Sequence, residues 1–248
     1  MRMPVITADR YDAVLFDLDG VLTKTAAVHE AAWKAMFDDY LRERARRGHE
    51  KFRPFTDDDY IRYVDGRPRN DGVTSFLASR SIELPPGASD DGTDRETAWG
   101  LGNRKNEMFN RILDEHGVEP YPDGVALLRG VRGAGIRTAV VSSSANTTAV
   151  LRRAGIFELF DARVDGTTVE RLGLAGKPAP DEYLEAAREL AVEPARAVVV
   201  EDAISGVQSG RAGGFGLVVG ADRRGDGDAL RAGGADVAVT DLSTLLPE

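Results

Sequence analysis

The chain has 248 residues, and its 32 lysine and arginine residues against 41 aspartate and glutamate residues give a formal net charge of −9. Hydrophobic residues make up 42% and charged residues 29%, which excludes a wholly disordered or collagen-like chain. A chain of this length forms one large domain or two smaller ones. An acidic surface repels phosphate backbones, so nucleic acid is not an expected partner.

The chain contains no cysteine, which excludes disulfides, thiol catalysis and thiolate metal sites. Its three histidines are too few for a histidine-rich zinc site. No apolar run approaches the roughly 18–20 residues of a membrane span, and residues 1–10 lack the apolar core of a signal peptide. We therefore expect a cytoplasmic protein without a membrane partner, and we favour a monomer.

The first predicted element is a short buried strand over residues 13–16. Residues 24–118 then differ in composition from the rest, since they hold both tryptophans and five of the nine phenylalanines. Large apolar side chains recur there at helical spacing, which predicts a helical insert with an aromatic core. Two stretches carry this spacing: Trp33, Met36, Phe37, Tyr40 and Leu41, and then Met108, Phe109, Ile112, Leu113 and His116. Proline, glycine and acidic residues over 83–94 predict a solvated loop.

From residue 119 onward, short runs of valine, alanine and isoleucine alternate with helical patterns. This alternation predicts a parallel sheet covered by helices. The clearest helical pattern places Tyr183, Leu184, Ala187, Leu190 and Ala191 on one face, and Asp181 is its expected N-cap. The expected strands are 138–141, 197–200, 216–219 and, as a weaker edge strand, 236–239, and the expected helices lie near 124–134, 145–154, 181–191 and 205–213.

These elements predict an α/β protein with a Rossmann-like, doubly wound parallel-sheet core and an inserted α-helical domain. The predicted core comprises residues 1–23 and 119–248, and the predicted insert comprises residues 24–118.

An acidic pair follows the first predicted strand, where Asp17 and Asp19 are separated by one residue. Gly20 permits a sharp exit of the chain from the strand. Two carboxylates at this position suit a metal or phosphate site. An Asp-x-Asp pattern is common, and taken alone it is more typical of a helix cap or of an acidic turn without Mg²⁺.

Two further polar segments precede predicted helices. Hydroxyl groups at a helix N-terminus bind phosphate well, although serines there also serve as ordinary N-caps; this segment is Ser142-Ser143-Ser144, followed by Asn146. Lys177 lies between Gly176 and Pro178, and prolines stiffen its backbone. A solvated loop lysine is the alternative interpretation.

The fourth segment is Glu201-Asp202, at the end of a strongly apolar run. Acids leaving a buried strand are costly unless they are paired or bind a metal. The carboxyl ends of parallel strands form one ligand crevice. The acids at these strand ends can therefore supply the oxygen ligands that Mg²⁺ prefers, while Ser142 and Lys177 contact a phosphate group.

In this order the motifs resemble those of the haloacid dehalogenase superfamily of phosphotransferases, and the helical insert resembles the small α-helical cap of that superfamily. The motifs are Asp17-Leu18-Asp19-Gly20, Ser142, Lys177-Pro178-Ala179-Pro180-Asp181 and Glu201-Asp202. Within the superfamily the chain is most similar to the β-phosphoglucomutase group. That likeness rests on Thr25, His29 and Trp33, on Gly66 and Arg69 of a cap phosphate loop, and on Arg104-Lys105-Asn106.

The resemblance implies Mg²⁺-dependent phosphoryl transfer through an aspartyl-phosphate. Asp17 is the implied nucleophile and Asp19 the implied general acid and base. The implied Mg²⁺ ligands are Asp17, the main-chain carbonyl of Asp19, Glu201 and Asp202. The implied phosphate- and substrate-binding residues are Ser142, Ser143, Asn146, Lys177, Gly66, Arg69, Lys105, His29 and Trp33. For His29, packing in the hinge is the alternative.

The implied substrate is a small sugar phosphate, namely β-glucose 1-phosphate converted to glucose 6-phosphate through glucose 1,6-bisphosphate. A sugar-phosphate phosphatase, in which water accepts the phosphoryl group, is the first alternative, and a non-catalytic binding protein is the second. Lys24 departs from the family pattern, where many relatives carry an acid. Three roles are open to it: pairing with a site carboxylate, contact with phosphate, or a neutral surface change. The cap loop near 80–98 is longer than the corresponding loop that the resemblance implies for the family.

Overall fold

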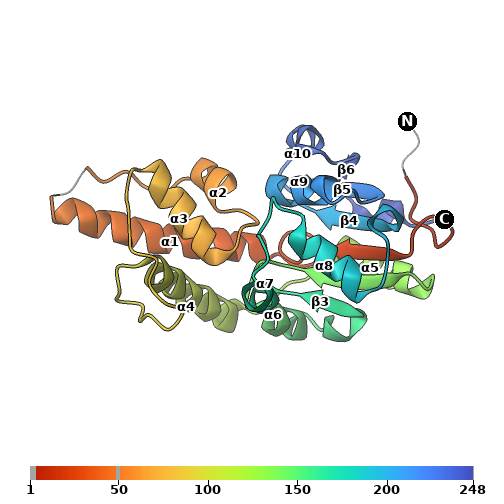
Figure 1. Cartoon of the computed structure of the whole chain (residues 1–248), viewed down its shortest axis with the longest axis horizontal. Coiled ribbons are helices and arrows are strands. Elements are labelled where there is room, and N and C mark those ends of the chain that lie inside the picture. Colours follow the sequence, from red (N-terminus) through yellow and green to blue (C-terminus); the bar gives the residue numbers. More distant parts are fainter. Residues whose placement is uncertain (1–3, 49–50, 248) are drawn as a thin grey trace. The chain divides into compact units, whose positions relative to one another are not determined.

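The computed structural model describes residues 4–48 and 51–247, which form two compact units (Figure 1). The sheet unit comprises Met1–Lys24 and Val118–Glu248, and the helical unit comprises Thr25–Gly117. The assignment of these units as catalytic core and cap stays a prediction.

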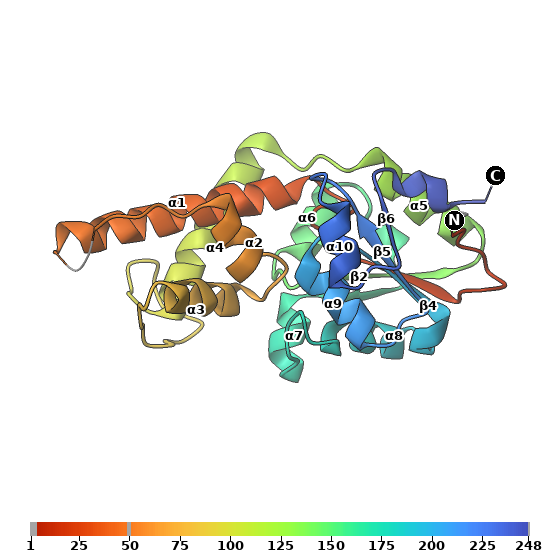
Figure 2. The ribbon, with the colours of Figure 1, turned by 90° about the horizontal axis from the view of Figure 1, so that it is seen from above.

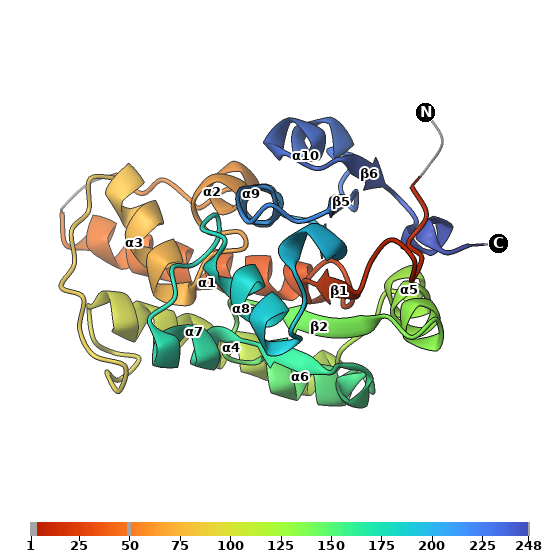
Figure 3. The ribbon, with the colours of Figure 1, turned by 45° about the vertical axis from the view of Figure 1, so that its right-hand side comes forward.

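The sheet unit is built on a parallel sheet with strand order β3-β2-β1-β4-β5-β6. Its strands within the described ranges are β1 (Ala13–Phe16), β2 (Arg137–Val141), β3 (Ala162–Val164), β4 (Ala197–Glu201), β5 (Leu217–Ala221) and β6 (Val237–Val239). β1 lies between β2 and β4, with Phe16 opposite Val140 on one side and Val200 on the other. Figure 3 shows β1 beside β2. The predicted α/β fold with a parallel sheet is thereby confirmed.

Helices cover both faces of this sheet, which is why its central strands are apolar throughout. α8 and α9 pack on one face through a buried cluster that includes Tyr183 and Val207, and α5 lies on the opposite side from α8 (Figure 2). The helices of the unit are α5 (Pro122–Gly133), α6 (Thr147–Arg153), α7 (Gly166–Leu172), α8 (Asp181–Glu189), α9 (Ile204–Ala212) and α10 (Gly227–Gly233), with 3₁₀ turns η1 (Phe157–Leu159), η2 (Pro194–Arg196) and η3 (Leu242–Leu245).

Two details of α8 correct the sequence prediction. Pro180 occupies the N-cap position, and Asp181 is the first helical residue. The Asp181 carboxylate instead accepts a hydrogen bond from the Ala175 backbone N–H at 3.1 Å, so it orders the preceding loop. The buried stripe is Tyr183, Ala186, Ala187 and Leu190, whereas Leu184 and Ala191 are exposed. Helical spacing thus identified three of the buried positions, Tyr183, Ala187 and Leu190, and missed Ala186.

In the described part of the sheet unit, the strand β3 and the helices α7 and α10 were not predicted. Each is short, and β3 carries Arg163 between Ala162 and Val164. Period counting needs a longer window than three to seven residues provide.

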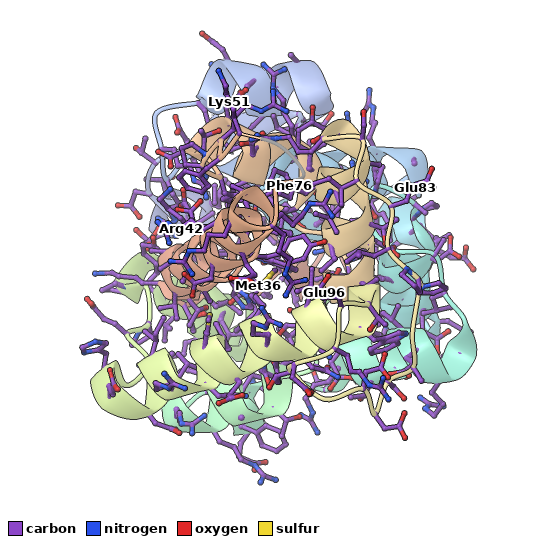
Figure 4. All side chains as sticks on the ribbon, turned by 90° about the vertical axis from the view of Figure 1, so that its left-hand side faces the viewer. Met36, Arg42, Lys51, Phe76, Glu83 and Glu96 are labelled. Carbon is purple, nitrogen blue, oxygen red and sulfur yellow. The ribbon has the colours of Figure 1, made fainter. Side chains whose placement is uncertain are left out.

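The helical unit contains α1 (Thr25–Arg46), α2 (Asp57–Tyr63), α3 (Arg69–Ser79) and α4 (Ala98–His116). Aromatic rings pack together in its core: between ring centroids, Phe37 lies 5.3 Å from Trp33, 5.1 Å from Phe55 and 4.3 Å from Phe76. Figure 4 shows Phe76 among the helices. The predicted aromatic core is confirmed, except that His116 at the end of α4 is exposed.

Residues 80–97 join α3 to α4 without a regular helix or strand, in agreement with the predicted loop. Side chains nevertheless tie this loop to the start of α4. Thr97 donates to the Asp91 carboxylate at 2.6 Å, and Arg104 donates to the Thr93 carbonyl at 2.7 Å. Figure 4 places Glu83, near the start of this loop, at the outer side of the unit. Among the residues that the structure describes, no helix has an apolar stretch long enough to cross a bilayer.

Candidate active site

The predicted acidic residues of the sheet unit meet at the carboxyl ends of β1 and β4. Asp17 directly follows β1, and its backbone N–H donates to the Val200 carbonyl at 2.9 Å. Glu201 is the last residue of β4, and Asp202 comes next. The strand order reverses at β1, and such a reversal in a parallel sheet opens a crevice for ligands.

Asp17, Glu201 and Asp202 form a carboxylate cluster whose ligand oxygens all lie within 4.8 Å of one another. Close backbone approaches hold two of these side chains in place. A Cβ on Gly20, whose φ is +88°, would lie 1.8 Å from Asp202 Oδ2, and a Cβ on Gly206 would lie 1.7 Å from Glu201 Oε1. Glycine is therefore required at both positions. A donor set made only of carboxylate oxygens fits Mg²⁺.

Lys177 is buried inside this cluster, with 2% of its surface exposed. Its Nζ donates to Asp17 Oδ1 and to Glu201 Oε1, each at 2.6 Å. It also lies 5.0 Å from the centre of the Tyr183 ring. The alternative of a solvated loop lysine is therefore wrong. An ammonium group beside the candidate nucleophile is placed to balance the charge of a bound phosphate.

Burial and charge act in opposite directions on the ionisation of this cluster. Burial would lower the pKa of Lys177, but the charges of Asp17 and Glu201 outweigh it and raise that pKa well above its usual value. The lysine therefore stays protonated. Burial raises the pKa of Asp17 against the opposing charge of Lys177, and the charges of Glu201 and Asp19 add to the rise. An additional cation among the carboxylates would favour the ionised form of Asp17.

The Glu201 carboxylate is already bound by four donors from the protein. Oε1 accepts from Lys177 and, at 3.0 Å, from the Tyr183 hydroxyl. Oε2 accepts from the backbone N–H groups of Asp202 and Ala203, both at 3.0 Å. Glu201 therefore orients Lys177 and the turn after β4. Its direct ligation of a metal stays a prediction.

The serine segment after β2 forms a turn whose hydroxyl groups take part in its own hydrogen bonds. Ser142 is buried, and its Oγ accepts from the Ser144 backbone N–H at 3.2 Å. The Asn146 backbone N–H donates to Ser144 Oγ at 3.2 Å, at the start of α6. Ser143 donates instead to the Glu182 carboxylate, at 2.9 and 3.1 Å. Contact of these residues with phosphate stays a prediction.

Sequence reasoning missed three residues around this site. Glu182 is fully buried in the first turn of α8, where burial raises its pKa against the opposing charge of Lys177 and the hydrogen bond from Ser143. Tyr183 was predicted only as a core residue. Arg223, after β5, donates to the Gly20 carbonyl. The available signals were the position of Glu182 and Tyr183 just after the Lys177 motif, and the position of Arg223 two residues after the buried strand β5.

In the helical unit, three predicted residues come together. Lys105 is 3% exposed, and its Nζ lies 2.5 Å from His29 Nδ1. The same Nζ lies 5.0 Å from the Trp33 ring and 4.8 Å from the Phe109 ring. The His29 ring stacks on Phe109 at 4.0 Å between centroids. His29 therefore packs on Phe109, and it also makes a polar contact with Lys105 that packing alone does not require.

Arg69 is the first residue of α3, and its side chain lies against α4. A Cβ on Gly102 would lie 3.3 Å from Arg69 Cγ and 2.9 Å from Asn70 Oδ1, so glycine allows the close approach of these helices. Gly66, three residues before the helix, has a φ of +72°. Lys24 belongs to the sheet unit, where it pairs with Glu119 rather than with a carboxylate of the cluster. It is therefore a surface residue.

Comparisons with known proteins show which family the chain is similar to. Residues 11–214 match the family model described as a haloacid dehalogenase-like hydrolase. A protein named beta-phosphoglucomutase from Mycobacterium bovis is 53% identical over 96% of this chain and 92% of its own length. A protein of the same name from Bacillus subtilis is 33% identical over 95% of this chain and 92% of its own length. The crystal structure of CbbY from Rhodobacter sphaeroides in complex with phosphate matches with a TM-score of 0.70 and 26% identity, covering 95% of this chain and 96% of that one.

Proposed function

Because the chain belongs to the haloacid dehalogenase-like hydrolase family, we propose that it is a Mg²⁺-dependent phosphotransferase that converts β-glucose 1-phosphate into glucose 6-phosphate. The observation that carries the chemistry is buried Lys177, which bridges Asp17 and Glu201 beside Asp202 at the strand ends. The identity shared with the mycobacterial relative supports the choice of sugar phosphate.

Asp17 is the proposed nucleophile. Its carboxylate attacks the phosphorus of glucose 1,6-bisphosphate, the bond to the sugar oxygen breaks, and an aspartyl-phosphate forms. In the opposite direction, a hydroxyl of the sugar monophosphate attacks the aspartyl-phosphate and regenerates the Asp17 carboxylate. Asp19 donates a proton to the leaving sugar oxygen and removes one from the attacking hydroxyl.

The remaining residues of the cluster position the phosphoryl group and balance its charge, which dominates catalysis of such transfers. Lys177 and Ser142 are proposed to contact the phosphoryl oxygens, with Ser143 and Asn146 shaping the turn beside them. Asp17, Asp202, the Asp19 carbonyl and Glu201 are proposed to hold Mg²⁺. When bound, the ion would reduce the repulsion between the carboxylate and the phosphate charge.

The helical unit is the proposed cap, and it distinguishes a mutase from a phosphatase. A mutase must hold the phosphate that is not being transferred, and guanidinium groups bind phosphate in a bidentate way. We assign this role to Arg69, with Gly66 shaping its loop. His29, Trp33 and Lys105 form the polar and aromatic group that organises the sugar side of the site.

The test is an assay that separates the two phosphoryl acceptors. The purified chain is incubated with β-glucose 1-phosphate, Mg²⁺ and a trace of glucose 1,6-bisphosphate, and glucose 6-phosphate and inorganic phosphate are measured in parallel. A mutase produces glucose 6-phosphate without matching release of phosphate. The α anomer serves as the control substrate and should not react.

A sugar-phosphate phosphatase is the second candidate, favoured by the hydrolase description of the family. The same buried cluster would then transfer the phosphoryl group from Asp17 to water. Release of inorganic phosphate in proportion to the sugar phosphate consumed, with no glucose 6-phosphate formed, would select this function over the mutase.

A further inference from the structure

Arg223 makes an unusually complete set of contacts just after β5. Its Nε donates to the Gly20 carbonyl at 2.9 Å, and Nη2 donates to the Val21 carbonyl at 3.2 Å. The guanidinium also pairs with both oxygens of Asp123, at 2.8 and 3.2 Å, and lies 4.0 Å from the centre of the Tyr121 ring. Only 11% of its side chain is exposed. A planar fork with five donors can satisfy such a set, and a lysine cannot.

The carbonyls that Arg223 binds belong to the turn that carries Asp19. This turn closes on itself, since Gly20 N–H donates to the Thr23 carbonyl at 2.8 Å and Thr23 N–H donates to the Leu18 carbonyl at 3.0 Å. A peptide group is planar and trans, so the direction of the Gly20 N–H sets the opposite direction of the Asp19 carbonyl. By its hydrogen bond to the Gly20 carbonyl, Arg223 likewise sets the orientation of the next peptide plane, between Gly20 and Val21.

Gly20 makes this second restraint necessary. Its φ of +88° suits glycine, and glycine also populates many other backbone conformations at little cost. The peptide between Gly20 and Val21 is therefore the flexible point of the turn. The hydrogen bonds from Arg223 to both carbonyls select one orientation of it.

Arg223 also reaches the two segments by which the chain leaves and re-enters the sheet unit. These segments pair with each other, since Lys24 N–H donates to the Glu119 carbonyl and Tyr121 N–H donates to the Leu22 carbonyl, both at 2.9 Å. Arg223 donates hydrogen bonds to the Gly20 and Val21 carbonyls of the outgoing segment, and its guanidinium lies over the Tyr121 ring of the returning segment. The turn and both segments are thus held by one side chain.

We propose that Arg223 is a positioning residue, which holds the turn over residues 18–23 so that the Asp19 carbonyl and side chain face the metal and the reacting phosphate. The inference rests on the proposed function, because that function gives Asp19 its two roles. Arg223 itself is not assigned any contact with the substrate.

The chain offers a matched control in Arg196. It binds Asp12 through Nε and Nη2, both at 2.8 Å, and it reaches the Asp9 carbonyl. This pair has the same chemistry as the pair between Arg223 and Asp123, but it precedes β1 and β4 rather than following them. Loss of Arg196 therefore measures the cost of losing a bidentate pair without disturbing the turn at Asp19.

The experiment compares Arg223→Gln with Arg196→Gln in the full chain. Binding of Mn²⁺, as a probe for the Mg²⁺ site, is measured by titration calorimetry without substrate, and thermal unfolding and steady-state kinetics follow. Loss of a residue that orients metal ligands typically costs 10–100-fold in affinity or activity. We expect Arg223→Gln to weaken Mn²⁺ binding and to lower kcat by about this factor, with a smaller change in KM for the sugar phosphate. Arg196→Gln should lower only the unfolding temperature.

Equal losses of thermal stability in the two variants, with Mn²⁺ affinity and kcat unchanged in both, would reduce Arg223 to a structural role and overturn the proposal. If Arg223→Gln does not fold, Arg223→Lys and Asp123→Asn replace it. The first keeps the charge without the fork, and the second removes the partner that orients Arg223. Both should still weaken Mn²⁺ binding, and normal binding in both would overturn the proposal.

The Mn²⁺ titration also separates this inference from the proposed function. Wild-type protein that binds Mn²⁺ but converts no sugar phosphate would contradict the proposed function. The comparison of Arg223→Gln with Arg196→Gln in metal binding would then still decide whether Arg223 orients the turn.

Discussion

At the scale of single residues, the site depends on one buried ammonium group shared between two buried carboxylates. Asp17 and Glu201 keep Lys177 protonated, and Lys177 in turn compensates the charge of these two buried carboxylates. Removing any one of these three charged groups therefore leaves an uncompensated charge in the low-dielectric interior. The variants that follow keep the shape of the side chain and change its charge.

Asp17→Asn should abolish formation of glucose 6-phosphate, because an amide cannot act as the nucleophile. It should also abolish labelling of the protein by radioactive acetyl phosphate. Asp12→Asn, at the other end of β1, serves as the control and should retain turnover. Near-normal activity of Asp17→Asn would contradict the aspartyl-phosphate mechanism.

Asp202→Asn should weaken metal binding, since the cluster loses one of its formal charges. We expect the Mg²⁺ concentration for half-maximal activity to rise by about tenfold or more, a factor that corresponds to ~1.4 kcal/mol. Excess Mg²⁺ should restore much of the rate. A Mg²⁺ dependence identical to that of the wild type would show that Asp202 is not a ligand.

At the scale of secondary-structure elements, α9 approaches β4 so closely that the Glu201 carboxylate lies against the backbone of Gly206. Gly206→Ala should therefore displace Glu201 and lower both activity and the free energy of unfolding. Gly133, at the end of α5, has nothing within 4 Å of an added Cβ. Gly133→Ala is the control, and it should be neutral or stabilise by up to about 1 kcal/mol. Urea unfolding and the mutase assay check both variants, and equal behaviour would contradict the assigned packing.

The start of α5 carries a pH-dependent part of the stability. Burial raises the pKa of Asp123, but hydrogen bonds from Arg223 and from the Leu242 backbone outweigh it and leave that pKa below its ordinary value. Folding thus favours the ionised carboxylate. Its contribution is fully present above the unfolded pKa and is lost as the pH falls through the lowered folded pKa.

Urea unfolding of Asp123→Asn and the wild type between pH 3 and pH 7 measures this contribution. We expect a constant difference in the free energy of unfolding above about pH 5, and a difference that shrinks below about pH 4. A difference that stays the same, or grows, as the pH falls would show that the pair with Arg223 does not lower the pKa of Asp123.

At the scale of the whole molecule, the proposed mutase needs both units, and Arg69→Ala tests the part played by the helical unit. Loss of a hydrogen bond to a charged group costs ~1.5–3 kcal/mol, so mutase turnover should fall by about 10–100-fold. Phosphoryl transfer from acetyl phosphate, which has no second phosphate, should largely survive. Arg67→Ala, two residues before Arg69 and outside α3, is the matched control.

Equal losses of Arg69→Ala in both reactions would assign Arg69 to folding of the cap rather than to phosphate binding. A loss confined to Arg67→Ala would transfer the role to that arginine. No loss of mutase turnover in Arg69→Ala would remove this residue from the proposed site.

Local patterns predicted most of the sheet unit, because runs of β-branched residues with a polar residue at the end are properties of neighbouring positions. β1 and β4 and the acidic residues that follow them were found in this way. The same reasoning missed β3, which has three residues, and misplaced the N-cap of α8 at Asp181. Short elements and helix ends depend on packing and loop contacts, which periodicity does not contain.

Sequence patterns alone were enough to predict the parallel α/β fold, the carboxylates and serines that follow buried strands, the lysine that precedes a helix, and the family to which these motifs belong. How those groups are used could be seen only in the folded chain. Glu201 is bound by Lys177 and Tyr183, Ser143 is bound by Glu182, and Arg223 reaches Gly20 across 203 positions of the chain. Such pairs follow from strand order and from the packing of helices on the sheet, because side chains far apart in sequence meet only where the folded backbone brings their elements together.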